Sequence, residues 1–343
     1  MRAMRMHRVM NIARGADPLR EEVVDVPRPA TDEVLVEVEF CGVCHTELDE
    51  IEGRTPPDEW PMTPGHQAVG RVVALGPGAD GDLLVQLVGV AWIHSACGEC
   101  QWCTSGRENL CPDFRATGRD APGGYAEYMT APAAFVHPLP RALDPLAAAP
   151  LLCAGAVGWR ALKACGLQDG APLGLTGFGA SAHLVIQFAR RRFPESPVYV
   201  FARDEDARAY ALELGAAWAG DTGDAPPDAP MAIIDTTPAW RPVLAALEVL
   251  APGGRLVINA IRKEAGDQSV LQELDYARHL WCEKQVVSVA NVTRRDVREC
   301  LDFAAQHGIR PEVTEHPLAQ ANEALRALKR GGSRGARVLR VSG

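Results

Sequence analysis

The sequence predicts an α/β protein in two parts, a mostly-β part followed by a doubly wound parallel sheet covered by helices. Up to about residue 150, short apolar runs alternate with turns rich in proline and glycine, as in an irregular β domain. Beyond residue 151, strand-length apolar runs alternate with helix-length segments, and this alternation predicts a parallel sheet. The 343 residues are enough for about two domains.

Hydrophobic periodicity predicts the individual elements. In the first part, residues 34–40 alternate as a half-buried strand should, and shorter apolar runs lie at 70–76 and 84–91. The chain ends with a helix around 295–307 and a strand at 336–341. For the second part we expect, in chain order, a helix at 154–165, a strand at 171–176, a helix at 181–191, a strand at 197–201, a helix at 204–214, a strand at 232–235, a helix at 241–250 and a strand at 254–259.

The composition is that of a soluble globular protein, with 47% hydrophobic and 23% charged residues. The net charge of −9 argues against a nucleic-acid or anionic-membrane partner. The arginines within residues 1–14 are not followed by an apolar core, so we expect no signal peptide. The longest apolar run, 146–159, contains Pro150, Gly155 and Gly158 and is predicted to be too short and too broken to span a membrane. We therefore expect a cytoplasmic protein.

Cys44 and His66 offer a thiolate and an imidazole, two ligand types that zinc prefers. They lie too far apart in sequence for a zinc-finger knuckle, which indicates a site that needs a third ligand from elsewhere and keeps a position open for substrate. Thr46 places a hydroxyl two residues from the thiolate. A buried cysteine and a core histidine, each common by itself, are the alternative.

Four cysteines lie within 15 residues: Cys97, Cys100, Cys103 and Cys111. Four soft ligands this close suit a closed tetrahedral zinc site that holds a loop together. An iron–sulfur cluster uses similar spacings, and free surface thiols are a third possibility.

The segment 177–182 matches the dinucleotide-binding pattern G-x-G-x-x-A and lies between a predicted strand and a predicted helix. Gly177 permits the tight turn, Gly179 lets the backbone approach a pyrophosphate, and Ala182 allows close packing of helix on strand. Phe178 and Ala180 complete the turn. An ordinary strand-to-helix turn is the alternative.

The end of the next strand distinguishes the two nicotinamide coenzymes. If the strand ends at Phe201, Ala202 takes the position of the acid that would bind the ribose 2′-hydroxyl of NAD. Arg203 follows and could pair with a 2′-phosphate, which favours NADP over NAD. Asp204 would restore an acid if the strand ended slightly later.

Together these motifs resemble the zinc-dependent alcohol dehydrogenases of the medium-chain dehydrogenase/reductase superfamily, over nearly the whole chain. The resemblance is carried by the four-cysteine segment and by residues 42–47 (Gly-Val-Cys-His-Thr-Glu), 64–66 (Pro-Gly-His), 150–155 and 177–182. It implies a GroES-like, mostly-β catalytic domain at 1–154 with a structural zinc lobe at 95–112, a Rossmann coenzyme domain at 155–290, and a return to the catalytic domain at 291–343.

The resemblance also names the third ligand of the first site. Cys153 matches the second catalytic cysteine of the family, whereas the residues alone left His94, His137 and Cys165 equally open. In the family the four-cysteine lobe binds structural zinc, so we expect two zinc ions per chain, one catalytic and one structural.

The activity implied is reversible hydride transfer between a primary or small alcohol and a nicotinamide cofactor, with an aldehyde or ketone as the other substrate. Zinc would polarise the substrate oxygen, and Thr46 would pass its proton on. Glu47 would orient His66, unless it is a solvated surface acid. A small-molecule substrate and a homodimer or homotetramer are the expected partners.

Three further residues gain roles from the resemblance. His45 and Arg337 would contact the coenzyme pyrophosphate, although Arg337 could also be a solvated charge at a strand edge. Trp92 would line the substrate pocket and favour small or slender alcohols, with plain core packing as the alternative.

Two positions depart from the family pattern. Asp49 stands where a proton-relay histidine is usual, so the relay would run through Asp49, His45 or water. Gln67 follows His66 where the family has an acid, which removes a negative charge near the metal. Neither departure removes a ligand.

Two other functional assignments compete with that of an alcohol dehydrogenase. A zinc-free quinone or enoyl reductase of the same superfamily would lack the Cys/His/Cys set and the lobe. A structural or regulatory zinc protein that binds nucleotide without turnover would keep both, and only an assay separates it from an enzyme.

Overall fold

The computed structural model describes residues 1–12, 17–331 and 334–342, and it divides into two compact units. The larger unit comprises Met1–Ala156 and Val292–Gly343, and the smaller comprises Val157–Asn291. The smaller unit is therefore an insertion into the chain of the larger one.

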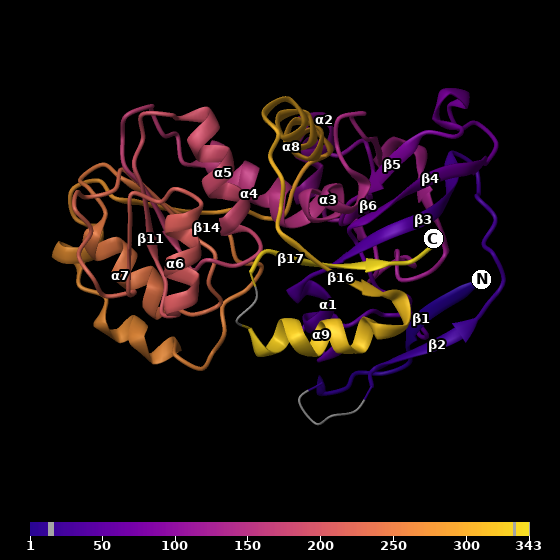
Figure 1. Ribbon diagram of the computed structural model, residues 1–343, viewed down its shortest axis with the longest axis horizontal. Coiled ribbons are helices and arrows are strands. Elements are labelled where there is room, and N and C mark those ends of the chain that lie inside the picture. Colours follow the sequence, from indigo (N-terminus) through magenta and orange to yellow (C-terminus); the bar gives the residue numbers. More distant parts are fainter. Residues whose placement is uncertain (13–16, 332–333, 343) are drawn as a thin grey trace. The chain divides into compact units, whose positions relative to one another are not determined.

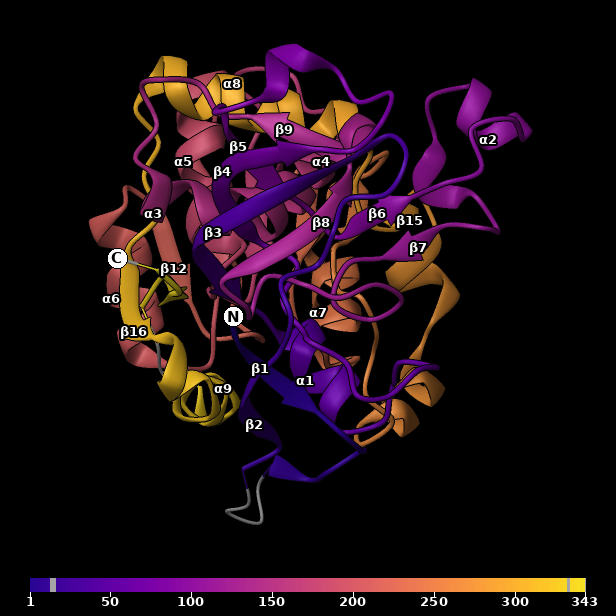
Figure 2. The same cartoon turned by 90° about the vertical axis from the view of Figure 1, so that its right-hand side faces the viewer.

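The larger unit is built on a seven-stranded sheet: six strands follow the order β16-β17-β3-β4-β5-β9, and the seventh, β8, pairs with β3. The last strand, β17, runs antiparallel to β3, so the C-terminal segment joins the sheet that the first part forms. Figure 2 shows β3, β4, β5, β8 and β9 side by side. The bounds are β3 Glu33–Val43, β4 Ala68–Leu75, β5 Leu87–Val90, β8 Tyr128–Pro132, β9 Val136–Pro138, β16 Val313–Pro317 and β17 Ala336–Arg340.

Two small antiparallel sheets complete this unit: β1 (Arg2–Met6) with β2 (Leu19–Val23), and β6 (Ile93–Ser95) with β7 (Arg115–Ala116). Its core joins β1, the main sheet and the C-terminal helix in one cluster of buried side chains that includes Met4, Val36 and Leu325. The helices are α1 His45–Ile51, α2 Gln101–Thr104, α3 Pro145–Pro150, α8 Arg294–His307 and α9 Ala321–Arg330.

The smaller unit is a parallel six-stranded sheet with the order β12-β11-β10-β13-β14-β15. Strands β10, β11 and β13 are buried at every residue, which explains why they read as continuous apolar runs rather than alternating ones. Its strands lie among helices α4 to α7 (Figure 1), and the predicted α/β fold class is confirmed. The bounds are β10 Leu173–Thr176, β11 Val198–Phe201, β12 Trp218–Gly220, β13 Ala232–Asp235, β14 Arg255–Ile258, β15 Gln285–Ser288, α4 Ala156–Ala164, α5 Ala182–Arg192, α6 Glu205–Glu213 and α7 Arg241–Val249.

The structure corrects the expected break in the apolar segment around Pro150. Helix α3, a π-helical turn at Leu151–Gly155 and helix α4 form one helical run, Pro145–Ala164, that is long and apolar enough to cross a membrane. Proline lacks an N–H group and removes one helical hydrogen bond, and the wider π-turn begins directly after it. Because 61% of its apolar 18-residue window is buried, the run has the character of a core helix.

Other differences are local. The apolar run at 84–91 forms a strand only from Leu87, because Val85 has a left-handed backbone with φ of 60°. Helix α9 and strands β12, β15 and β16 were not expected from the sequence. These elements are short or expose one face, so their pattern of apolar residues is weak.

Histidine 137, in β9, is 5% exposed, and burial together with Arg298 and Arg294 lowers its pKa from 6.5 to about 4. Between pH 6.5 and 4 the unfolded chain binds a proton here that the folded chain does not. The free energy of unfolding should therefore fall by about 3 kcal/mol through this residue as the pH drops across that window. A His137→Gln variant should show a shallower loss in denaturant titrations at pH 7, 5.5 and 4. An equal loss in both proteins would contradict this prediction.

Candidate active site

Cys44 lies at the junction between the central strand β3 and helix α1. The strand ends at Val43, and the Cys44 N–H donates to Oε2 of Glu47 at 2.8 Å, one turn into the helix. The Sγ atom of Cys44 lies 3.6 Å from Oγ1 of Thr46. The thiol and the hydroxyl predicted to work together are thus neighbours, while the side chain of His45 is exposed.

His66 is completely buried, and the turn before it depends on glycine. Gly65 has φ of 103°, and a Cβ there would lie 2.4 Å from the ring of Tyr125. Nδ1 of His66 lies 2.6 Å from Oε1 of Glu47, so Nε2 is the ring nitrogen left for another partner. Glu47 is wholly buried, which excludes the alternative that it is a solvated surface acid.

Cys153 lies in the π-helical turn and completes the cluster. The ligand atoms of Cys44, His66 and Cys153 all lie within 4.8 Å of one another. In the described part of the chain, no group of side chains close enough together to hold a metal ion includes the other candidates, His94, His137 or Cys165.

The charges of this cluster depend strongly on one another. The hydrogen bond from Cys153 and the proximity of His66 hold the pKa of the Cys44 thiol well below its usual range, although burial opposes this. The hydrogen bond with Cys44 and burial raise the pKa of Cys153. Burial alone would lower the pKa of His66, but Glu47 and Cys44 outweigh it and raise it. Two thiols and an imidazole that meet in one place are ligand types that zinc prefers.

The two departures from the family pattern have structural consequences. Asp49 is 2% exposed and accepts a hydrogen bond from Nε of Arg54 at 2.5 Å, so its carboxylate is already engaged. Gln67 is also buried, and its side chain packs beside Gly42.

Glu50, next to Asp49 in the sequence, is fully buried, and burial and the charge of Glu47 raise its pKa well above the usual range.

The four-cysteine segment forms a second cluster, with Cys97, Cys100, Cys103 and Cys111 also within 4.8 Å of one another. The Sγ atom of Cys97 is 3.9 Å from that of Cys103 and 3.6 Å from that of Cys111. It also accepts the N–H of Cys100 at 3.4 Å. Neither these nor the six other cysteines form a disulfide bond.

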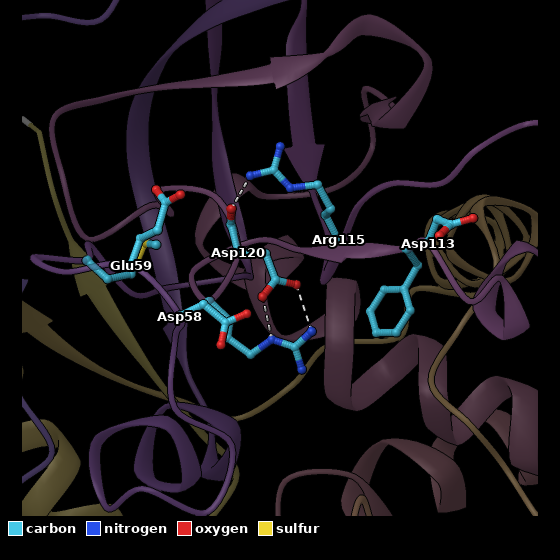
Figure 3. A pocket seen from close by; sticks show the side chains of 8 residues that line it. Asp58, Glu59, Asp113, Arg115 and Asp120 are labelled. Atoms are coloured by element: carbon cyan, nitrogen blue, oxygen red, sulfur yellow. Dashed lines mark hydrogen bonds and ion pairs between the residues drawn. The ribbon is translucent and has the colours of Figure 1, made fainter.

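Trp92 packs against the wall of a pocket of about 500 Å³ that the sequence did not reveal. Its ring lies 5.1 Å from that of Phe114, and the guanidinium of Arg119 lies 5.6 Å from both rings. Arg119 forms two hydrogen bonds with the carboxylate of Asp120. Figure 3 shows Asp58 and Asp113 on opposite sides of Asp120. The pocket is lined by Asp58, Glu59, Met62, Asp113, Phe114, Arg115, Arg119 and Asp120.

The glycine turn of the smaller unit has the geometry that its pattern predicts. Strand β10 ends at Thr176, Gly177 has φ of 76°, and helix α5 begins at Ala182. The space over exposed Gly179 is open, since a Cβ there would meet nothing within 4 Å. Phe178 is buried against Tyr210, with ring centroids 5.7 Å apart.

Strand β11 ends at Phe201, so the buried Ala202 follows the strand directly. Arg203 is exposed. Asp204 directly precedes helix α6, and its carboxylate accepts the N–H of Ala207 at 2.9 Å. The acid that could have restored an NAD-type site is therefore used as a helix cap.

Arg337 lies in β17 directly opposite Val43, the residue before Cys44. Its Nη1 lies 3.3 Å from Nε2 of His316. Burial lowers the pKa of Arg337, which is inconsistent with a fully solvated charge at a strand edge.

A buried ion pair next to the glycine turn also escaped sequence reasoning. Lys263 pairs with Asp235, and the two side chains are 8% and 0% exposed. The Lys263 ammonium also donates to the carbonyls of Thr237 and Ala239 at 2.7 and 3.0 Å. No motif marks this pair in the sequence, because the two residues meet only when the loops after β13 and β14 come together.

The sequence of residues 30–141 matches the family model for the alcohol dehydrogenase GroES-like domain. The chain is 45% identical to a probable alcohol dehydrogenase, AdhA, of Mycobacterium tuberculosis, over 94% of this chain and 93% of that protein. It is 33% identical to an alcohol dehydrogenase of Geobacillus stearothermophilus, over 93% and 95% of the two chains.

Solved structures show the same likeness. A cinnamyl alcohol dehydrogenase of Sorghum bicolor superposes with a TM-score of 0.84 at 27% identity, covering 100% of this chain and 98% of that one. A thermostable alcohol dehydrogenase of Pyrobaculum aerophilum, at 23% identity, shares the fold with a TM-score of 0.88 over 99% of both chains. The chain therefore belongs to the zinc-dependent alcohol dehydrogenases of the medium-chain dehydrogenase/reductase superfamily and is an oxidoreductase.

Proposed function

We propose that this enzyme interconverts small alcohols with their aldehydes or ketones at a zinc ion held by Cys44, His66 and Cys153. The observation that carries the proposal is the convergence of these three ligand atoms within 4.8 Å, from three separate segments of the chain. A set of two thiolates and one imidazole is typical of a catalytic zinc site that keeps one position for substrate.

The surroundings of the cluster fit this metal. Glu47 fixes Nδ1 of His66 and so directs Nε2 to the ion, as carboxylates commonly do for metal-bound imidazoles. When bound, zinc acts as a Lewis acid on the substrate oxygen, and the nicotinamide coenzyme carries the hydride. The lobe cysteines, four soft ligands without an open position, suit a second, structural zinc.

Thr46 is the first proton carrier in this proposal. Its Oγ1, on a side chain only 6% exposed, is the hydroxyl next to the Cys44 thiol. Asp49 is held by Arg54 and suits a structural role better than a relay. The exposed imidazole of His45 adjoins Thr46 in sequence, and we assign the next step of proton transfer to His45 or to water.

The pocket beside Trp92 admits the substrate. Phe114 and Met62 provide apolar surface and Arg119 is paired with Asp120, while the other acids of the lining give the pocket a net negative charge. The bulky indole behind this wall favours small or slender alcohols.

We propose that the coenzyme binds at residues 177–182 and that NADP is preferred over NAD. The end of β11 at Phe201 leaves Ala202 at the usual position of the acid, and Asp204 caps a helix instead. Arg203 is then free to pair with a 2′-phosphate. Arg337, beside Val43, is assigned to the pyrophosphate together with His45.

A homodimer is the assembly we favour, formed through β15. This strand lies at one edge of the sheet of the smaller unit, and Val286 within it is 46% exposed. Tyr276 and Trp281, 63% and 58% exposed, form a ring pair just before the strand. An uncovered edge strand with apolar side chains is a ready pairing surface for a second copy.

We further propose that this enzyme acts in the cytoplasm.

Metal analysis tests the catalytic zinc. The wild type should contain two zinc ions per chain, and Cys153→Ala should keep one of them and lose alcohol oxidation, because the lobe ligands are untouched. Cys165→Ala, which alters a buried thiol outside both clusters, should keep both ions and the activity. Unchanged alcohol oxidation in Cys153→Ala would refute the assignment, and two zincs without turnover in the wild type would favour a non-enzymatic role.

Coenzyme preference tests Arg203. Arg203→Ala should lower kcat/KM for NADP about tenfold or more while leaving that for NAD nearly unchanged, because only NADP has the phosphate that Arg203 would bind. Arg295→Ala removes the same charge from an exposed position on α8 and should change neither value. If the preference of Arg203→Ala equals that of the wild type, Arg203 has no part in it.

Light scattering tests the assembly. Val286→Lys puts a charge into the exposed edge of β15 and should reduce the mass in solution to that of one chain. Val73→Lys, at a position 39% exposed in β4, should leave the mass at two chains. A dimer that survives Val286→Lys must form through another surface.

A further inference from the structure

We propose that the carboxylate of Glu50 retains the metal ion held by Cys44, His66 and Cys153 and is a further residue of this site. This inference rests on the proposed zinc ion at those three ligands. Glu50 follows the motif at residues 42–47 and belongs to no pattern of its own. It acts on the ion through its charge and is not itself a ligand.

The side chain of Glu50 is buried without a partner. The residue is 0% exposed, and within the described part of the chain neither Oε1 nor Oε2 forms a hydrogen bond. Burial of a carboxyl group costs free energy unless hydrogen bonds or a cation accompany it. A buried carboxyl group that has neither is rare in folded proteins, and it indicates a missing partner.

Helix α1 places Glu50 on the side of the metal cluster. Cys44 directly precedes the helix, and Glu47 in its first turn contacts both Cys44 and His66. Glu50 follows Glu47 by one helical turn, so the two side chains lie on the same face of the helix. The electrostatics agree with this placement. Burial raises the pKa of Glu50 most, the charge of Glu47 raises it further, and the charges of His66 and Cys44 also act on it.

The missing partner of Glu50 is a cation that the chain itself does not supply. Arg119 acts on Glu50 through its charge, but its guanidinium donates two hydrogen bonds to the carboxylate of Asp120, at 2.8 and 2.7 Å. Glu47 on the same helix face is an acid and offers no positive charge. A divalent ion at the neighbouring cluster has the charge that Glu50 lacks, and attraction between opposite charges is strong in a buried site because the effective dielectric constant is low.

Glu50 supports the ion from outside the set of ligands. In the described residues, the ligand atoms that lie within 4.8 Å of one another at this site are those of Cys44, His66 and Cys153, and Glu50 is not among them. These three leave one tetrahedral position for substrate. A carboxylate near the ion therefore strengthens metal binding without filling that position. Residues that support a metal from outside its ligands contribute about tenfold to hundredfold in metal affinity.

Gln67 allows the charge to be moved. It follows His66 in the sequence and is 3% exposed, and its neutral amide brings no charge to the site. Glutamate has nearly the same shape as glutamine. Gln67→Glu would therefore place a carboxylate next to the same ligand from a different segment of the chain.

Zinc release from the full-length protein to a colorimetric chelator tests the inference. Glu50→Gln keeps the shape and removes the charge, so it should weaken binding of the catalytic zinc about tenfold or more and leave the lobe zinc in place. Adding Gln67→Glu to this variant should restore retention of the catalytic zinc, because the negative charge returns to the site. The melting temperature of zinc-free Glu50→Gln should not fall below that of the zinc-free wild type, since the change removes a buried group that has no partner.

Asp49→Asn is the matched control. Asp49 lies on the same helix and is 2% exposed, but it has its own cation, since Nε of Arg54 donates to it at 2.5 Å. This variant should lower the melting temperature and leave zinc retention unchanged.

Three outcomes would overturn the role of Glu50. They are zinc retention in Glu50→Gln equal to that of the wild type, a double variant that loses the ion as readily as Glu50→Gln does, and a zinc-free Glu50→Gln that melts well below the zinc-free wild type. A wild type that binds zinc only at the four-cysteine lobe would instead overturn the proposed catalytic metal site itself.

Discussion

The proposed metal site depends on one buried carboxylate, that of Glu47. One of its oxygens accepts the N–H of Cys44, and the other lies 2.6 Å from Nδ1 of His66. Glu47 thereby joins the end of β3 to the turn before β4, two segments that the sequence separates by 22 positions. If Glu47 were apolar, the thiol and the imidazole would lose their common anchor, and the imidazole would lose the partner that directs Nε2.

The position of Glu47 also determines the charge of the site. A wholly buried carboxylate is unfavourable unless a cation or several hydrogen bonds accompany it. Here it is accompanied by two thiols and an imidazole, and Glu47 and Cys44 raise the pKa of His66 against the effect of burial. Glu50, buried beside it with a raised pKa, is disfavoured as a second anion in the same region. One divalent cation would satisfy the cluster, which explains why the loss of an acid at Gln67 is compatible with metal binding.

Much of this molecule was predictable because its signals are local. The alternation of strand and helix, the four-cysteine segment and the glycine turn each lie within a short stretch, and the structure has the corresponding elements within a few residues. The end of β11 at Phe201 was predictable from the length of one apolar run. The role of Cys153 was not, since residues alone left three rivals open, and only resemblance to a family or the fold selects it.

What could not be predicted requires contacts between distant segments. The pocket near Trp92 joins residues around Asp58 with residues around Asp120, and neither stretch carries a motif. The helical run through Pro150 shows a local rule overridden by packing, because a π-turn accommodates the missing hydrogen bond inside a core helix.

Asp235 and Glu47, two of the buried carboxylates in the described residues, show how similar residues come to serve different roles. Asp235 has its own counterion: Lys263 neutralises it, and each ammonium donor has an acceptor within the same unit. All partners in that network belong to the chain itself, and the network holds the loop that carries Lys263. Glu47 has no lysine or arginine bonded to it in the described residues, and its bonds go to a backbone N–H and an imidazole instead. We therefore propose that the positive charge at this site is supplied by a metal ion held by Cys44, His66 and Cys153.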